Sequence, residues 1–325
     1  MEYNIMENSD VLKILYENKG EFVSGEEMAN RFNISRAALS KRIAKLKDKG
    51  IEIDAVTNKG YKLKFLSNNI CEENASLGIL ENQVIGNTIF ALEEIDSTNE
   101  YAKKIAKNNK TGTVVTSNLQ TSGKGRRGRG FVSEYGGLYF SIILKPNVSI
   151  DKIPFLTQLS ACSVYKAMEE LKISTKIKWP NDIILNDKKL CGILCEMSCE
   201  MDYVSYVVAG IGINIANVEF DEDLQKIATT LEKEGHYINK LDLFWRILRH
   251  FDYFYKKFEK DDYNEMIDIL RKNSSILGKK ISVISLDQTR NATALDIDEK
   301  GFLKVQYENG ETEHLNYGEI SIRNV

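Results

Sequence analysis

The residues best suited to chemistry lie in a glycine- and arginine-rich segment, SGKGRRGRG, at residues 122–130. Glycine lets a backbone approach a phosphate closely, and an arginine guanidinium binds oxyanions through paired hydrogen bonds. The order of residues matches neither the Walker pattern nor a Rossmann fingerprint. The segment therefore predicts a mobile anion-binding loop, and a flexible basic linker is the alternative. Its basic residues are Lys124, Arg126, Arg127 and Arg129.

A second cluster, KWPND, occupies residues 178–182. Downstream of it, the pair Asn-Asp at 186–187 lies between apolar runs and predicts a tight hairpin with a two-residue loop. In that register residue 182 faces residue 191, and Asp182 and Lys189 share one face as diagonal neighbours. A carboxylate and an ammonium beside an anion-binding loop could hold Mg²⁺ and a phosphate. A surface turn with a weak ion pair is the alternative.

The apolar run YVVAGIGIN places two glycines, Gly210 and Gly212, inside a predicted strand. Glycine weakens a strand and often marks the close approach of a ligand to its backbone. Asn214 follows at the strand end, where it could present an amide to a ligand. A packing role for both glycines is an equal alternative.

The thiols and imidazoles do not form a catalytic or metal-binding pattern. Five cysteines are an odd and sparse set for 325 residues, which indicates reduced thiols rather than disulfides. Cys191, Cys195 and Cys199 lie four residues apart, and we expect a strand with core thiols there rather than a zinc site. Three scattered histidines offer little to a triad or a histidine-rich metal site.

Positive charge is concentrated toward the amino-terminal end. Residues 31–64 carry ten bases and three acids, a charge of +7, so the remainder of the chain carries −10. A basic module on an acidic protein is typical of nucleic-acid binding, and a solvated helix face is the alternative.

The same region has the pattern of a winged helix-turn-helix. Apolar spacing predicts a helix at 9–18, and Ser24 and Ser35 are expected to cap two further helices. The runs IEIDAV and YKLKFL flank a turn at 57–60 and predict a two-stranded wing. The second helix of the motif enters the major groove of DNA, whereas a packing or dimerisation module is the alternative. The predicted DNA-binding residues are Ser35, Arg36, Ala37, Ser40, Lys41, Lys59 and Lys62.

Length and patterning predict a multidomain α/β protein, since domains usually span roughly 100–200 residues. After a polar linker at 67–69, strands and helices alternate to about residue 273, which indicates a mixed α/β domain. An aromatic-rich amphipathic helix at 240–260 should pack in its core. Short strands with glycine turns from about residue 278 predict a small β-barrel. The predicted domains are 1–66, 67–274 and 275–325.

No apolar run approaches the roughly 18 residues of a membrane span. The start, MEYNIMENSD, lacks the basic and apolar regions of a signal peptide. We therefore expect a cytoplasmic protein without a membrane partner.

In combination, these motifs resemble those of bifunctional biotin protein ligases that also repress the biotin operon. The similar segments run from about residue 20 to the end of the chain, and no single one is sufficient. They are SGEEMANRFNISRAALSKRI, IDSTN, GKGRRGRG, KWPND, KKLCGIL, GIGIN and GEISIR. The resemblance implies a winged helix-turn-helix, a central biotin ligase domain and a C-terminal SH3-like β-barrel.

The resemblance also implies a reaction. Such a ligase joins the biotin carboxylate to the α-phosphate of ATP, with Mg²⁺, and transfers biotin to a lysine on the biotin carboxyl-carrier domain of a carboxylase. The intermediate, biotinyl-5′-adenylate, is then the corepressor, which promotes a homodimer on operator DNA of biotin genes. Alternatives are a ligase whose winged helix is not regulatory, a regulator on an inactive enzyme scaffold, and a lipoate ligase, although the GKGRRGRG loop favours biotin.

By motif, the implied biotin pocket comprises Ser97, Thr98, Asn99, Gln120, Lys124, Gly125, Arg126 and Lys189. The implied nucleotide-binding residues are Arg126, Arg127, Arg129, Phe131, Asn181 and Asn214. Lys189, Asp182 and Arg126 are the implied catalytic residues, and Asp182 is the candidate Mg²⁺ ligand. Two departures predict weaker adenylate affinity: Lys124 replaces a common arginine and loses its paired hydrogen bonds, and Phe131 replaces a common tryptophan.

Overall fold

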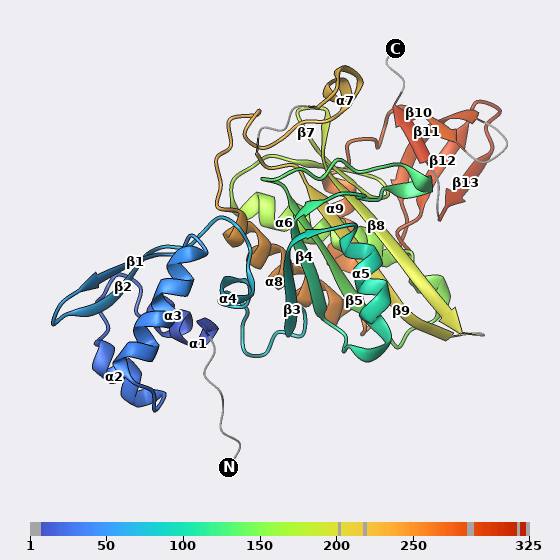
Figure 1. Ribbon diagram of the computed structural model, residues 1–325. Helices are drawn as coiled ribbons and strands as arrows, with labels where there is room; N and C mark the ends of the chain where they lie inside the picture. The colour runs from blue at the N-terminus through green and yellow to red at the C-terminus, as the bar shows by residue number, and fades with distance from the viewer. Residues whose placement is uncertain (1–7, 201–202, 217–219, 285–288, 317–318, 323–325) are drawn as a thin grey trace.

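A computed structural model of the chain describes residues 8–200, 203–216, 220–284, 289–316 and 319–322. Figure 1 shows a small amino-terminal lobe, a central body built on a large sheet, and a small carboxy-terminal sheet. Within the described ranges, no helix is both long and apolar enough to cross a bilayer. Most of the MEYNIMENSD start, and Gly318 and Arg323 of the GEISIR segment, lie outside these ranges.

The amino-terminal lobe is the predicted winged helix-turn-helix. Ser24 Oγ accepts a hydrogen bond from the Glu27 amide at 3.4 Å, and Ser35 Oγ accepts one from the Ala38 amide at 3.1 Å. Each serine therefore satisfies an amide that the first turn of its helix leaves unpaired. The elements are α1 (Asn8–Glu17), α2 (Gly25–Arg31), α3 (Arg36–Asp48), β1 (Glu52–Val56) and β2 (Gly60–Phe65).

The central body contains a seven-stranded sheet with strand order β3-β4-β5-β9-β8-β7-β6. Strands β3 and β4 are parallel and are connected by helix α5 (Thr98–Ile105), whereas the other neighbours are antiparallel. The strands are β3 (Thr88–Ile95), β4 (Thr113–Gln120), β5 (Leu138–Leu144), β6 (Lys176–Lys178), β7 (Asp182–Leu185), β8 (Lys188–Glu200) and β9 (Tyr203–Ile213).

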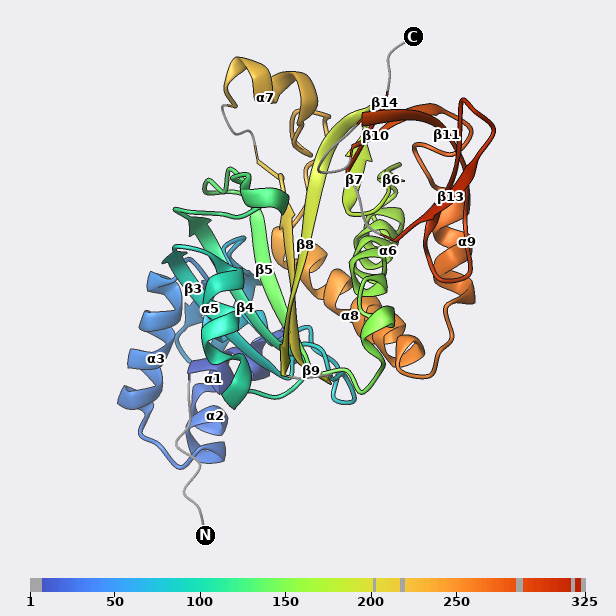
Figure 2. The same ribbon diagram turned by 90° about the vertical axis from the view of Figure 1, so that its right-hand side faces the viewer.

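Helices cover both faces of this sheet (Figure 2). Helices α6 (Phe155–Glu170), α8 (Lys240–Phe258) and α9 (Asn264–Lys272) pack on one face, and α5 packs on the other. Successive strand residues point to opposite faces, so Val114 is buried against the first layer and Val115 against the second. The remaining helical segments are α4 (Glu72–Ala75), α7 (Glu222–Ile227), η1 (Ala106–Asn108), η2 (Arg126–Gly128) and η3 (Ile150–Lys152).

Helix α8 is the aromatic-rich core helix that the sequence predicts. Tyr253 of this helix is 47% exposed, and its other six Phe, Tyr and Trp side chains lie in the main hydrophobic core. They are Phe244, Trp245, Phe251, Phe254, Tyr255 and Phe258.

The hairpin between β7 and β8 has the predicted two-residue loop, and both residues at 186–187 have positive φ. Strand β8 carries an extra residue, Leu190, at a bulge, so Asp182 pairs with Gly192. The predicted pairing of residue 182 with residue 191 is therefore wrong, because a bulge sets two residues of one strand against one of its partner.

The carboxy-terminal unit is a small antiparallel sheet with order β13-β12-β11-β10-β14. Gly301 and Gly310 have φ values of +80° and +84° in the two turns that the sequence predicts. The carbonyl of Gly301 accepts hydrogen bonds from Trp179 Nε1 at 3.0 Å and Gln158 Nε2 at 2.7 Å, which fasten this sheet to the body. Its strands are β10 (Lys280–Ile284), β11 (Thr289–Ile297), β12 (Leu303–Tyr307), β13 (Thr312–Leu315) and β14 (Glu319–Ile322).

Candidate functional site

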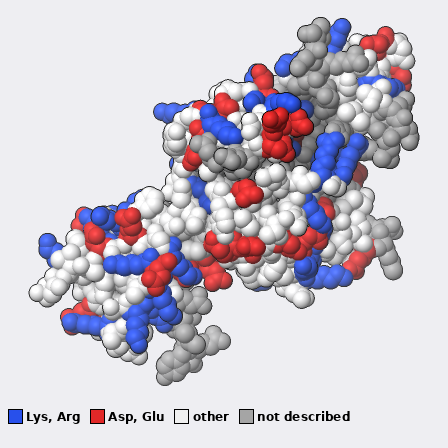
Figure 3. All heavy atoms as spheres, turned by 45° about the horizontal axis from the view of Figure 1, so that its top comes forward, with Lys and Arg blue, Asp and Glu red and all other residues white. Residues whose placement is uncertain are grey.

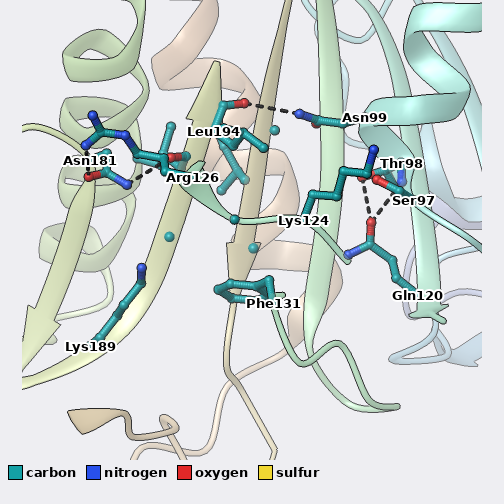
Figure 4. A pocket seen from close by; sticks show the side chains of 16 residues that line it. Ser97, Thr98, Asn99, Gln120, Lys124, Arg126, Phe131, Asn181, Lys189 and Leu194 are labelled. Atoms are coloured by element: carbon teal, nitrogen blue, oxygen red, sulfur yellow. Dashed lines mark hydrogen bonds between the residues drawn. The ribbon is translucent and has the colours of Figure 1, made fainter. Parts of the chain in front are cut away.

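A single pocket collects most of the predicted site residues beneath the glycine- and arginine-rich loop. Figure 4 shows Phe131 between two groups of side chains, with Lys124 beside Ser97, Thr98, Asn99 and Gln120 on one side and Asn181 beside Arg126 and Lys189 on the other. The cavity beneath the loop measures about 40 Å³. The predicted residues that line it are Ser97, Thr98, Asn99, Gln120, Lys124, Gly125, Arg126, Phe131, Asn181 and Lys189.

The uncharged side of the pocket is a closed set of hydrogen bonds at the start of α5. Gln120 Oε1 accepts from the amide of Thr98 at 2.8 Å and from Thr98 Oγ1 at 3.1 Å. Gln120 Nε2 donates to Ser133 Oγ at 2.9 Å, and Ser141 Oγ lies 2.8 Å from Thr98 Oγ1. These partners hold the amide and hydroxyl groups in fixed orientations, as recognition of a polar ring requires.

Asn99 is held in the same way, and the backbone of β9 makes room for it. Its Nδ2 donates to the Leu194 carbonyl at 3.3 Å and to Glu196 Oε2 at 2.8 Å, and its Oδ1 accepts from Ser141 Oγ at 2.6 Å. A Cβ atom at Gly210 would lie 2.1 Å from Asn99 Oδ1. Glycine at 210 is therefore required for Asn99 to occupy this position.

The Phe131 ring packs against Gly212, the other glycine of β9. A Cβ atom at Gly212 would lie 2.7 Å from the Phe131 ring, and one at Gly192 would lie 3.1 Å from it. The close approach expected at Gly210 and Gly212 is thus made by the chain's own side chains. The ring lies against the backbone of Gly192 and Gly212.

The cationic side of the pocket contains Arg126 and Lys189. Arg126 Nη1 donates to Asn181 Oδ1 at 3.1 Å. Lys189 Nζ lies 2.7 Å from Asp182 Oδ1, which is the ion pair expected from the hairpin. The approach lacks the angles of a hydrogen bond, so this buried carboxylate oxygen has a close cation but no hydrogen-bond donor.

Four predicted residues do not line the pocket. Arg127 has a φ of +55° and directs its guanidinium away, donating to the Ile284 carbonyl at 3.4 Å. Arg129 is exposed, and Asp182 reaches the pocket only through Lys189. Asn214 is buried and donates to the Thr229 carbonyl at 3.2 Å. Their ligand-binding roles remain predictions.

Sequence reasoning missed three polar residues that position the pocket: Ser133, Ser141 and Glu196. Ser141 is a single polar residue in the apolar strand LYFSIIL, and that interruption is a signal that could have identified it. The roles of Ser133 and Glu196 depend on contacts with residues far away in the chain, and no local pattern marks them.

Among the described residues there is no cluster of three or more Cys, His, Asp or Glu side chains that could hold a metal ion. Cys191 is buried, Cys195 is partly buried and Cys199 is exposed along β8. The expectation of core thiols therefore fails at Cys199. Burial raises the pKa of Cys195 to about 11, which keeps this thiol protonated and unreactive at neutral pH.

The candidate DNA-binding surface lies on the separate amino-terminal lobe, where Figure 3 shows basic side chains gathered. All five predicted residues of α3 and its cap are exposed, as is Lys59 on the wing, whereas Lys62 is half-buried. The ammonium groups of Lys59 and Lys62 lie 6.0 and 5.6 Å from the centre of the Phe22 ring. Arg36 forms an exposed ion pair with Glu26, which a phosphate would have to replace.

Comparison with known proteins agrees with this architecture. Three family models match: "HTH domain" at residues 8–62, "Biotin/lipoate A/B protein ligase family" at 91–214, and "Biotin protein ligase C terminal domain" at 276–323. The bifunctional ligase/repressor BirA of Bacillus subtilis is 34% identical over 307 residues, which cover 93% of this chain and 94% of that protein. This chain belongs to the family of bifunctional biotin ligase/repressors.

Other members agree in sequence and in structure. BirA of Escherichia coli is 29% identical over 310 residues, 94% of each chain. A biotin protein ligase from Aquifex aeolicus, solved in complex with biotin and ATP, aligns with a TM-score of 0.64 at 30% identity. The alignment covers 74% of this ligase/repressor and 100% of the Aquifex chain. Both the ligase fold and its helix-turn-helix extension are therefore shared with characterised relatives.

Proposed function

We propose that the protein couples biotin to ATP, forming biotinyl-5′-adenylate and pyrophosphate, and transfers the biotinyl group to a lysine of a biotin carboxyl-carrier domain. The same adenylate acts as corepressor when the winged helix binds operator DNA of biotin genes. The observation that carries this proposal is the pocket itself, where ten motif residues meet. Hydroxyl and amide groups lie with Lys124 at one end, and Arg126 and Lys189 lie at the other.

The two ends suit the two parts of the reaction. The amide and hydroxyl groups of Gln120, Thr98 and Ser97 match the polar ureido ring of biotin. Arg126 and Lys189 match the biotin carboxylate and the α-phosphate, whose charges repel each other until cations neutralise them. A bond forms between a carboxylate oxygen and the α-phosphorus as the bond to pyrophosphate breaks. This chemistry needs positioning and charge neutralisation and no protein nucleophile.

Asp182 fits the Mg²⁺ that the ATP reaction implies. Its Oδ1 is buried without a hydrogen-bond donor, and magnesium commonly binds one or two carboxylates together with substrate phosphates. Bound there, Mg²⁺ would neutralise phosphate charge. Lys189 would then be released from its ion pair to contact the reacting oxygens.

The loop and Phe131 must move when substrates enter. Ligand pockets usually measure about 300 Å³ or more, whereas the present cavity is about 40 Å³. Movement of Phe131 away from Gly192 and Gly212 would open a flat surface suited to adenine, with the ring free to stack on it. We propose that adenylate then orders the loop and favours a homodimer with two DNA-binding wings, and that the functional units are residues 1–66, 67–274 and 275–325.

The ligase reaction is tested with purified protein, MgATP, biotin and an isolated biotin carboxyl-carrier domain. We expect biotin to appear on the acceptor lysine by mass spectrometry, and lipoate in place of biotin to give no transfer. Transfer of lipoate instead would identify a lipoate ligase, and transfer of neither would contradict the proposal.

The repressor role is tested by fluorescence anisotropy of DNA from upstream of the organism's own biotin genes. Binding should tighten only when biotin and MgATP are both present, because only then does adenylate form. Phosphate contacts also require that binding weaken as salt rises. An active ligase that binds this DNA under no condition would be a ligase whose winged helix is not regulatory.

A further inference from the structure

A line of alternating charges runs beside the pocket, from the loop to the central sheet. Glu100 on α5 forms ion pairs with Lys124 of the loop and, at 2.6 Å, with Lys103 one turn further along its helix. Lys103 also donates to Glu196 Oε1 on β8 at 2.9 Å. We call these four residues the Glu100 network: Lys124, Glu100, Lys103 and Glu196.

The inner end of the network reaches the floor of the pocket. Glu196 Oε2 accepts a hydrogen bond from Asn99 Nδ2, the side chain that fills the space over Gly210. Glu196 thus uses one carboxylate oxygen for Lys103 and the other for a pocket amide. A displacement of Lys103 would therefore change the position of Glu196 and, through its hydrogen bond, that of Asn99.

The outer end of the network holds a compact loop. The amide of Gly125 donates to the Arg129 carbonyl at 2.7 Å, and the amide of Phe131 donates to the Gly123 carbonyl at 2.8 Å. These bonds close the segment on itself, so an anchor at Lys124 restrains residues 123–131 as a unit. The anchor is a side chain that lines the pocket.

The network is electrically balanced and only partly hydrated. It contains two carboxylates and two ammonium groups, and the side chains of Glu100 and Lys103 are each 27% exposed. Hydrogen bonds from Lys103 and then Lys124 lower the pKa of Glu100 to about 2. The carboxylate therefore stays charged at any pH at which the enzyme would work.

We propose that Glu100 is a positioning residue that latches the loop over the pocket through Lys124 and couples the latch to Asn99 through Lys103 and Glu196. This inference rests on the proposed biotin ligase function, because the loop is useful as a cover only if a ligand lies beneath it. Glu100 itself does not line the pocket and touches no reacting group.

The size of the effect follows from the exposure of the pair. Partly exposed ion pairs shift an equilibrium by about two- to fivefold when one partner is removed. If biotin is retained only under the closed loop, its apparent dissociation constant rises in inverse proportion to the closed fraction. The fold increase in loop opening multiplied by the fold increase in the biotin dissociation constant therefore equals the shift in the equilibrium. A loop that is mostly closed shows the shift in its opening, and a loop that is mostly open shows it in biotin affinity.

Limited proteolysis measures loop opening directly, because the loop contains four trypsin sites within residues 124–129. Full-length protein without ligands is treated with trypsin, and cleavage at the three arginines is followed by mass spectrometry. Glu100→Gln should be cleaved faster than the wild type, by at most about two- to fivefold. Glu200→Gln is the matched control, since it breaks a 2.9 Å pair with Lys107 away from the loop and should leave the rate unchanged.

A second variant tests whether Glu100 acts through Lys124. Lys124→Gln removes the other half of the latch and should by itself accelerate cleavage at the remaining arginines. Adding Glu100→Gln to Lys124→Gln should then have no further effect, as expected for two residues of one contact. Full additivity of the two rates would overturn the proposal, even if one variant folded less well.

Steady-state kinetics distinguish the proposed latch from a role of Glu100 in folding alone, because only the latch changes the KM for biotin without changing kcat. The fold rise in the KM for biotin of Glu100→Gln multiplied by its fold rise in cleavage should be about two- to fivefold, with kcat at saturating biotin and MgATP unchanged. Wild-type cleavage and KM in Glu100→Gln, or a fall in kcat alone, would refute the latch. Proteolysis requires no biotin, so a wild-type protein without ligase activity would contradict the proposed function and leave the latch comparison interpretable.

Discussion

Three charged side chains dominate the electrostatics of the candidate active site: Arg126, Lys189 and Asp182. Without substrate, Arg126 is directed to an amide oxygen of Asn181 and Lys189 to the carboxylate of Asp182. Both cations are therefore held by partners that phosphate and carboxylate oxygens can replace. Cations prearranged in this way need little reorganisation when charge develops on the reacting oxygens.

Replacement of Lys189 tests this arrangement at the scale of one residue. Lys189→Ala should slow biotinyl-adenylate formation by about 10²-fold or more, the scale for loss of one prearranged oxyanion partner. Pyrophosphate release under saturating biotin and MgATP measures the rate. Lys188→Ala is the neighbouring control, because Lys188 donates to the Gln225 carbonyl and does not line the pocket. Near-normal turnover of Lys189→Ala would remove this lysine from the mechanism.

At the scale of elements, the start of helix α8 is where the linker after the winged helix meets the sheet. The amide of Lys240 donates to Asn68 Oδ1 at 2.8 Å, and its buried ammonium donates to Asn118 Oδ1 on β4 at 3.1 Å. Asn118 in turn donates to Glu93 Oε2 on β3 at 3.0 Å. Burial lowers the pKa of Lys240 to about 8, because the interior disfavours its charged form.

This lowered pKa predicts a pH dependence of stability. Between pH 8 and the ordinary lysine value of 10.5, the unfolded chain binds more protons at this position than the folded protein does, so the contribution of Lys240 to stability rises with pH. From pH 7 to pH 9.5 the gain is about 2 kcal/mol. The Lys240→Met variant should not show this gain in stability. Urea unfolding of both proteins at the two pH values measures the difference, and parallel pH profiles would contradict the expected buried charge.

At the scale of the whole molecule, the winged helix is docked on the ligase body. Tyr16 of α1 packs edge-on against Trp245 of α8 at 5.9 Å between ring centres, and Trp245 Nε1 donates to the Ala75 carbonyl at 2.7 Å. Lys49, which follows α3, donates to both carboxylate oxygens of Glu73 at 2.5 and 2.7 Å. The amino-terminal lobe and the ligase body thus share side-chain contacts, which provide a physical route between them.

The Lys49–Glu73 pair gives a prediction for this interface. Burial raises the pKa of Glu73, but the hydrogen bond from Lys49 and other donors outweigh it, and the pKa is lowered overall from 4.5. The pKa of Lys49 is raised from 10.5, chiefly by the hydrogen bond to Glu73. The pair therefore stabilises the fold between the ordinary pKa values of 4.5 for Glu73 and 10.5 for Lys49. This stabilisation is lost as pH falls through the lowered pKa of Glu73 or rises through the raised pKa of Lys49.

Lys49→Met should consequently destabilise the protein by about 1 kcal/mol at pH 7, since it leaves a buried carboxylate without its cation. The loss should shrink below pH 4.5 as Glu73 takes up a proton. Lys47→Met, at an exposed position of α3, is the control and should be neutral. Denaturant unfolding at pH 7 and pH 3.5 measures the stability of both variants. If Lys49→Met loses as much stability at pH 3.5 as at pH 7, the Lys49–Glu73 pair is excluded as the cause.

The sequence by itself determined the features that depend on neighbouring residues. Ser24 and Ser35 cap helices within three positions of themselves, and the loop at 186–187 turns within two residues. The aromatic spacing of α8 predicts its buried face because helical periodicity alone decides which residues point inward. The motifs likewise identify the site residues by type, since phosphate and carboxylate chemistry selects particular side chains.

Only the tertiary structure decided which distant residues meet. Nothing within a few positions of Gly210 shows that Asn99 occupies the space above it, or that Leu190 bulges and moves the pairing of Asp182 to Gly192. Glu100, Lys124 and Glu196 form one network although 96 positions separate Glu100 from Glu196, because β4 and β8 belong to the same sheet and α5 packs beside them. Strand order and register place these groups together, and both follow from the packing of the whole sheet rather than from any local pattern.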